Sequence, residues 1–156
     1  MGAAPDIAVR ERTGPKADPV RVLVVDDSPT VRAVFARLIG EESDLALAAA
    51  EDSAERALAS LVQTAPDVIL LDVRMPRRTG VEACRAIKEA VPATKIIMLT
   101  VSDEEADLYE SVKNGAAGYL LKDSSIEEVA QAIRVVNEGQ SLISPSMAVK
   151  LIDEFK

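Results

Sequence analysis

The chain has 156 residues, enough for one domain with a short appendage, and its 48% hydrophobic content is typical of a globular protein with a buried core. Lys and Arg number 18 against 26 Asp and Glu, which gives a net charge of −8. A surface this acidic repels nucleic-acid phosphates and anionic lipids, so we expect the chain to bind neither directly. The sequence has no His, which excludes imidazole metal sites, and its single cysteine, Cys84, excludes an internal disulfide.

The two ends of the sequence differ in character from the part between them. Residues 1–19 are rich in Pro and Gly among mixed charges and are predicted to form a flexible tail. Residues 20–139 carry the pattern of a folded domain, and residues 140–156 that of a linker-like helix. We find no apolar run long enough to cross a membrane and no secretory signal, so we expect a cytoplasmic protein.

From Val20 onward, short apolar runs of strand length alternate with longer amphipathic segments. The pattern predicts strands at Val20–Asp26, near Leu45–Ala50 (weaker and Ala-rich), at Val68–Leu71, at Lys95–Thr100 and at Tyr119–Leu121. The helices predicted after these strands run from about Pro29 to Ile39, with a stop at Gly40, from a cap at Asp52 or Ser53 to Thr64, and over Val81–Ala90, Asp103–Asn114 and Ser125–Glu138. A final helix is predicted from Ser144-Pro145.

Five strands, each followed by a helix, indicate an α/β fold with a doubly wound parallel sheet and helices on both faces. Strand segments such as Val22–Val25 and Ile96–Leu99 are fully apolar, as expected where both faces of a sheet are buried. Five units are too few for an eight-stranded barrel.

Polar residues follow four of the predicted strands. The first strand leads into Asp26 and Asp27, the third into Asp72, the fourth into Thr100 and the fifth into Lys122. Each alone is ordinary, because a chain that leaves a strand returns to solvent. Together they would converge at one edge of the sheet, where open α/β sheets bind their ligands.

Three carboxylates at one site repel one another. At about 4 Å and an effective dielectric of about 20, each pair costs about 4 kcal/mol. A divalent cation relieves this repulsion, and hard oxygen ligands suit Mg²⁺. The charges of three acids, Mg²⁺ and Lys122 sum to zero, so the site could hold a phosphoryl group while the metal screens it.

The motifs VLVVDDSPTVR, DVILLDVRMPRRTG, IIMLT and AAGYLLKD resemble those of the receiver domain of two-component response regulators, over Val20–Gly139. The last motif, with SSIEEVAQAI and SLISP after it, is most similar to the NarL/LuxR-like subfamily. The resemblance implies a five-stranded sheet of flavodoxin-like order 2-1-3-4-5. It also implies a switch rather than an enzyme, one that accepts a phosphoryl group and promotes its own phosphorylation and dephosphorylation.

The resemblance also implies roles for single residues. Asp72 would accept the phosphoryl group, and Asp27, Asp72 and the Arg74 carbonyl would bind Mg²⁺, with Asp26 acting largely through water. Thr100 and Lys122 would each bind a phosphoryl oxygen.

Tyr119 would rotate into space vacated by Thr100 and complete a switch that moves the surface around Asp103–Asn114. The alternative is that Tyr119 has only a structural role, as a half-buried ring with a solvent-exposed hydroxyl. The sequence departs from the family at Val101, which is bulkier than the usual small residue and could crowd the phosphoryl entrance.

The partners implied are a sensor histidine kinase and, through a helix-turn-helix domain absent from this sequence, DNA. Phosphorylation could also produce a homodimer, and no membrane partner is expected.

Three alternatives stay open. One is a stand-alone receiver that acts through protein contacts. The second is a Mg²⁺-dependent phosphatase with an aspartyl nucleophile, although such enzymes usually read Asp-x-Asp after the first strand. The third is a flavodoxin-like FMN binder, whose phosphate Asp26 and Asp27 would repel. Cys84 lies at helical core spacing, and we expect a structural role for it, as for the Met75-Pro76 and Gly80 loop.

Overall fold

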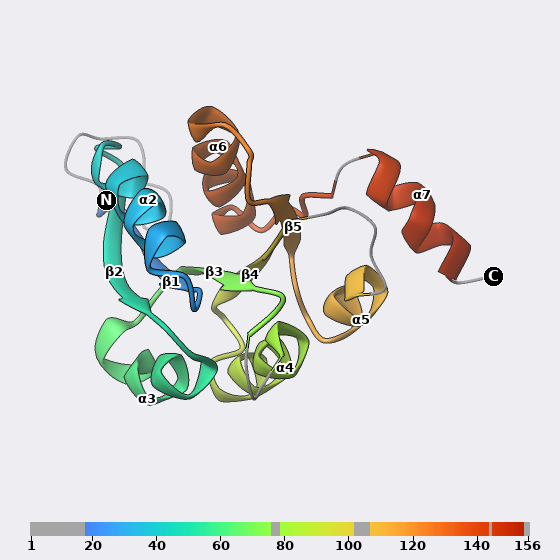
Figure 1. Ribbon diagram of the computed structural model, residues 1–156, viewed down its shortest axis with the longest axis horizontal. Coiled ribbons are helices and arrows are strands. Elements are labelled where there is room, and N and C mark those ends of the chain that lie inside the picture. Colours follow the sequence, from blue (N-terminus) through green and yellow to red (C-terminus); the bar gives the residue numbers. More distant parts are fainter. Residues whose placement is uncertain (1–17, 76–78, 102–106, 144, 155–156) are drawn as a thin grey trace, which may run out of the picture.

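A computed structural model describes residues 18–75, 79–101, 107–143 and 145–154 (Figure 1). Its elements, in order, are β1 (Val20–Val25), α2 (Pro29–Gly40), β2 (Leu45–Glu51), α3 (Ala54–Thr64), β3 (Val68–Asp72), α4 (Gly80–Ala90), β4 (Lys95–Thr100), α5 (Asp107–Lys113), β5 (Gly118–Leu121), α6 (Ile126–Asn137) and α7 (Pro145–Glu154). All neighbouring strands are parallel, in the order β2-β1-β3-β4-β5. The predicted fold class and strand order are therefore confirmed.

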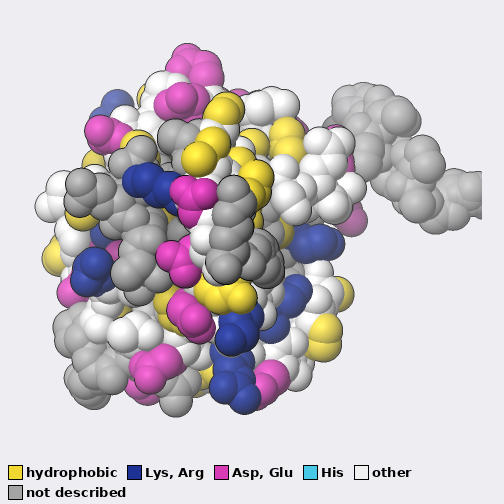
Figure 2. Space-filling view, turned by 90° about the vertical axis from the view of Figure 1, so that its right-hand side faces the viewer, with side chains coloured by type: hydrophobic (Ala, Val, Ile, Leu, Met, Phe, Trp, Pro, Cys, Tyr) yellow, Lys and Arg dark blue, Asp and Glu magenta, His cyan; other side chains and the backbone are white. Residues whose placement is uncertain are grey.

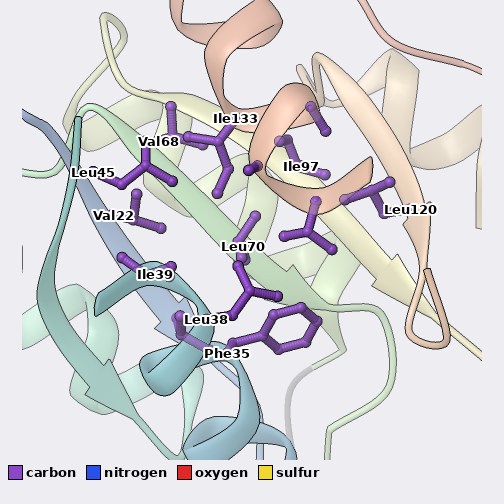
Figure 3. Close-up of a cluster of buried hydrophobic side chains, with 14 of the residues drawn as sticks. Val22, Phe35, Leu38, Ile39, Leu45, Val68, Leu70, Ile97, Leu120 and Ile133 are labelled. Atoms are coloured by element: carbon purple, nitrogen blue, oxygen red, sulfur yellow. The ribbon is translucent and has the colours of Figure 1, made fainter. Parts of the chain in front are cut away.

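The sheet separates two hydrophobic clusters, because successive side chains of a strand point to opposite faces. One cluster lies beneath α2 and α6, where Phe35, Ile39 and Ile133 pack on Val22 and Leu70 (Figure 3). The other cluster lies beneath α3 and α4 and reaches α5 on the opposite face (Figure 1). Helices thus cover both faces, which explains why the central parts of β1, β3 and β4 are apolar.

Short polar side chains start the helices by accepting backbone N–H groups that have no partner within the helix. Ser28 caps α2 ahead of Pro29, and Ser53 caps α3. Reciprocal capping boxes begin the two helices that follow β3 and β5. They pair Thr79 with Glu82 at α4, and Ser125 with Glu128 at α6. Each capping residue directly precedes its helix and so sets where that helix begins.

Four boundary predictions need correction or lie wholly or mostly outside the described residues. Gly40 does not stop its helix from outside, because it is the last residue of α2 and Glu41 is the C-cap. The described part of α5 begins at Asp107, so the predicted start at 103 falls outside the described residues, as do the Ser144 cap and most of the predicted tail at 1–19. No described helix is long and apolar enough to cross a membrane.

Gly80, at the start of α4, approaches the end of β3 more closely than any side chain would permit. A Cβ built on Gly80 would lie 2.1 Å from the Asp72 carbonyl oxygen and 2.7 Å from Val73 Cα. Its N–H donates to the Val73 carbonyl at 2.8 Å. Residue 80 can therefore lie this close to the end of β3 only because it has no side chain.

We expect Gly80→Ala to lower the free energy of unfolding by about 3 kcal/mol, because backbone must shift to admit the methyl group. Gly40→Ala is the matched control, since a Cβ there has no neighbour within 4 Å and Ala favours a helix. It should be neutral or stabilising by up to about 1 kcal/mol. Urea unfolding measures both, and equal stabilities of the two variants would contradict the close approach.

Candidate functional site

The polar residues predicted at the strand ends do meet at one edge of the sheet. Asp26 and Asp27 directly follow β1, Asp72 ends β3, Thr100 ends β4 and Lys122 directly follows β5. Because all these strands are parallel, their carboxyl ends share that edge. The register agrees, since Asp72 pairs with Leu99, the residue before Thr100.

Lys122 bridges two buried carboxylates. Its Nζ atom lies 2.8 Å from Asp26 Oδ2 and 3.1 Å from Asp72 Oδ1. The Asp26 side chain is 0% exposed, that of Asp72 is 4% exposed and that of Lys122 is 17% exposed. The ammonium is the only described cation paired with either acid. It therefore compensates charges that burial would otherwise make very costly.

Burial shifts the protonation of the bridged groups. Desolvation raises the pKa of Asp72 from 3.8 to about 6, and the nearby Asp26 carboxylate adds to the rise, while Lys122 and the Arg74 N–H oppose it. Burial alone would lower the pKa of Lys122, but its contacts with Asp26 and Asp72 raise it overall. Lys122 thus stays charged, and Asp72 ionises only near neutral pH unless a further cation is bound.

The three acids form a cluster that could hold a metal ion. One carboxylate oxygen from each of Asp26, Asp27 and Asp72 lies within 4.8 Å of the others. Asp27 is exposed, so it remains accessible to an entering ion, whereas Asp26 Oδ1 accepts the Ser28 N–H and the buried Asp26 Oδ2 has the Lys122 ion pair but no hydrogen bond. This all-oxygen set fits a hard divalent cation.

Three residues that the sequence analysis did not assign to the site form hydrogen bonds with Asp26. Its N–H donates to the Glu51 carbonyl of β2 at 3.1 Å, and its Oδ1 accepts the Ser28 N–H at 2.9 Å. Arg32 of α2 donates from Nη1 to the Asp26 carbonyl at 2.8 Å. Ser28 could have been found from its position before Pro29, but no local pattern points from Arg32 to Asp26.

The remaining predicted residues surround this cluster. The Thr100 carbonyl accepts the Lys122 N–H at 2.7 Å, and Thr100 is buried. The Arg74 N–H donates to Asp72 Oδ1 at 3.1 Å. Val101, by contrast, is exposed beside Thr100. The structure thus brings every predicted site residue except Tyr119 to the strand-end edge.

Tyr119 lies inside the core. It is 3% exposed and belongs to the cluster beneath α3 and α4, together with Cys84. The half-buried alternative is therefore wrong for this conformation. Cys84 is also fully buried, and burial raises the pKa of its thiol to about 11, in agreement with a structural role.

Comparison with known proteins agrees with this geometry. The sequence matches the family model of the response regulator receiver domain over residues 22–134. The uncharacterized transcriptional regulatory protein YxjL of Bacillus subtilis (strain 168) is 41% identical over 137 residues, which are 88% of this chain and 63% of that protein. Response regulator GacA of Pseudomonas viridiflava is 39% identical over 132 residues, 85% of this chain and 62% of that protein. The chain thus spans just under two thirds of these relatives.

Solved structures show the same likeness. A two-component response regulator of the LuxR family from Aurantimonas sp. SI85-9A1 superposes with a TM-score of 0.80 at 31% identity, covering 88% of this chain and 99% of that one. The receiver domain of the NarL response regulator from Mycobacterium tuberculosis gives a TM-score of 0.74 at 32% identity, and the match covers 79% of this chain and 99% of that one.

We expect Lys122→Met to lower the free energy of unfolding by about 3 kcal/mol near pH 8 in metal-free buffer, because two buried carboxylates lose their cation. The folded-state pKa of Asp72 lies above its unfolded value of 3.8, so ionisation of Asp72 costs stability as pH rises toward 6. Loss of Lys122 would raise that pKa further.

The loss of unfolding free energy caused by Lys122→Met should therefore be smaller near pH 4.5, where Asp72 is protonated in the folded protein. Urea unfolding at the two pH values measures it, with Lys113→Met, at an exposed lysine of α5, as control. A loss of stability that is the same at both pH values would contradict the ion pair of Lys122 with the buried acids.

The family match covers most of the chain, and relatives above 30% identity extend over 85% of it or more. Independently of these matches, the sheet order and the acid cluster have the arrangement that the resemblance implied. The chain therefore belongs to the response regulator receiver family, and its relatives place it with the NarL/LuxR-family regulators.

Proposed function

We propose that this receiver accepts a phosphoryl group on Asp72 from a sensor histidine kinase and changes conformation in response. The observation that carries the proposal is the Lys122 ammonium, held within 3.1 Å of Asp72 Oδ1 at the open end of a buried strand. A buried acid beside one fixed cation is suited to nucleophilic attack on an electrophile whose developing negative charge the cation stabilises.

The transfer itself is an exchange at phosphorus. An ionised oxygen of Asp72 attacks the phosphorus of the donor, and a new P–O bond forms as an acyl phosphate. The bond from phosphorus to the donor nitrogen breaks, and its electron pair stays on the departing imidazole, which takes a proton. With acetyl phosphate as donor the leaving group is acetate. Lys122 and the Thr100 hydroxyl would each bind a phosphoryl oxygen, so the chain contributes positioning and charge compensation.

The acid cluster supports a Mg²⁺ requirement. Asp27 and Asp72, with the Arg74 carbonyl, would hold the ion, and Asp26 would act through water, because its oxygens already pair with Lys122 and the Ser28 N–H. A bound Mg²⁺ supplies positive charge that lowers the pKa of Asp72 and screens the incoming phosphoryl oxygens. Asp72 would then be ionised at neutral pH.

Thr100 and Tyr119 would carry the change away from the site. Movement of Thr100 toward a phosphoryl oxygen alters the packing around β4, and the Tyr119 ring already lies in the core on the neighbouring strand. Their joint movement would displace α5, which follows β4.

The output belongs to the rest of the protein. YxjL is a transcriptional regulatory protein that extends beyond the matched region, so transcription control through a helix-turn-helix domain is the proposed output. A homodimer on phosphorylation and a cytoplasmic location are part of the same proposal, and a stand-alone receiver acting through protein contacts is the alternative. The chain would be a self-modifying switch rather than an enzyme that turns over a separate substrate.

Incubation with acetyl phosphate and Mg²⁺, followed by intact-mass spectrometry, tests the proposal. Wild type should gain one phosphoryl group, and the gain should vanish with EDTA and in Asp72→Asn. Asp123→Asn is the matched control, since Asp123 is an exposed carboxylate one residue beyond Lys122, and it should be phosphorylated as wild type is. A gain that survives in Asp72→Asn would contradict the assignment of the acceptor, and rapid turnover of simple phosphate esters would favour the phosphatase alternative.

A further inference from the structure

Arg32 reaches back from the first turn of α2 to the loop that carries two of the three clustered acids. Its Nη1 atom donates to the Asp26 carbonyl at 2.8 Å, and its backbone N–H donates to the Ser28 carbonyl at 3.0 Å. Backbone and side chain of this half-buried residue are thus bonded to the same short loop. The side chain therefore ties the start of α2 to the residue that follows β1.

The accepting carbonyl belongs to the peptide group that joins Asp26 to Asp27. A peptide group is planar, so an oxygen held in place restricts ψ of Asp26 and φ of Asp27 together. Asp26 has three further contacts, through its N–H, its Oδ1 and the ion pair of its Oδ2. Asp27 is exposed, and its side chain forms no hydrogen bond or ion pair within the described part of the chain. The backbone thus sets where the Asp27 carboxylate lies, and Arg32 holds the peptide group before it.

The position of Arg32 departs from what helix stability alone favours. It is the fourth residue of α2, and the first turn of that helix carries no acid. Unpaired N–H groups make this end of a helix electropositive, so an Arg is less favourable here than in the last turn, where Arg37 lies. Such departures from local rules are expected at residues that serve a site. The bond to the Asp26 carbonyl is the compensating interaction.

We propose that Arg32 is a positioning residue for the divalent cation, which it serves by holding the Asp26–Asp27 peptide group so that the Asp27 carboxylate stays near Asp72. The inference rests on the Mg²⁺ requirement of the proposed function. One carboxylate oxygen from each of the three acids lies within 4.8 Å of the others, and the Arg32 bond preserves that spacing. Because Arg32 donates to a carbonyl, it takes no carboxylate oxygen away from the ion.

The charge of Arg32 and its hydrogen bond make opposite predictions for its removal. A guanidinium near the acid cluster repels an incoming cation, so loss of the charge alone would tighten Mg²⁺ binding. Loss of the hydrogen bond would free the peptide group, and the ion would then have to order Asp27 on binding, which weakens binding. The sign of the change in Mg²⁺ affinity therefore separates the two roles.

Calorimetric titration of Mg²⁺ into the full chain near pH 8, where Asp72 is ionised, measures this sign. Arg32→Met removes the charge and the donor, and it should raise the Kd for Mg²⁺ about fivefold, as expected for one hydrogen bond. In metal-free buffer the ¹⁵N order parameter of the Asp27 amide should fall in this variant, while those of β1 stay unchanged. Unchanged or tighter binding would overturn the inference and leave the proposed function intact. Failure of the wild type to bind Mg²⁺ would overturn both the inference and the Mg²⁺ requirement.

Arg37→Met is the matched control for loss of charge. It removes the same charge from the same helix, at a side chain that is 84% exposed and paired with Glu41 at 3.4 Å. Acidic and basic side chains lie interspersed on the face shown in Figure 2, and exposed charges of this kind are screened by solvent. Arg37→Met should therefore change the Kd less than twofold. Equal effects of Arg32→Met and Arg37→Met would overturn the inference.

Arg32→Lys tests whether a charged donor at this position is sufficient. The contact uses a single nitrogen, so one ammonium on a long side chain can replace it. This variant should bind Mg²⁺ within about twofold of the wild type and restore the order parameter of the Asp27 amide. A loss of affinity as large as that in Arg32→Met would contradict the role given to the hydrogen bond.

Discussion

The ion pair between Lys122 and two buried carboxylates is the interaction on which the rest of the site depends. Parallel strands bring Asp26, Asp72 and Lys122 to one edge whatever their chemistry, but two acids buried side by side would repel each other. The ammonium makes their burial tolerable, but desolvation by burial, together with the Asp26 carboxylate, outweighs it and raises the pKa of Asp72 to about 6. A site poised in this way gains from binding a metal ion, and it can hold a phosphoryl group once the ion is present.

Backbone and side-chain contacts hold the acids of this ion pair in place. Asp26 is held through its N–H, its carbonyl and its carboxylate oxygens, and Gly80 lies against the end of β3. On the far side of the sheet, two backbone hydrogen bonds join Leu142 to Ala117 and Tyr119 along the outer edge of β5. Acids held in this way suit a site that should keep its geometry while its ligands change.

Much of this arrangement was predictable from sequence because it rests on alternation and on strand ends. Even the Ala-rich strand near Leu45–Ala50, the weakest by propensity, is present as β2, since it lies beside β1 and packs Leu45 beneath α2. The convergence of Asp72 with Lys122 followed from parallel pairing. What the sequence could not give depends on contacts between distant residues, such as the Arg32 clamp on Asp26 and the docking of Leu142 on β5. The burial of Tyr119 is a tertiary property of the same kind, and the position of Gly40 within α2 reflects a helix that continues for one residue more.

Direct titration of the Asp72 carboxyl carbon by ¹³C NMR, in metal-free buffer and then with saturating Mg²⁺, tests the central claim of a buried, partly compensated acid. The account predicts a midpoint near 6 without metal, because desolvation and Asp26 outweigh Lys122, and a clearly lower midpoint with Mg²⁺. A midpoint near the ordinary 3.8 that Mg²⁺ leaves unchanged would contradict it.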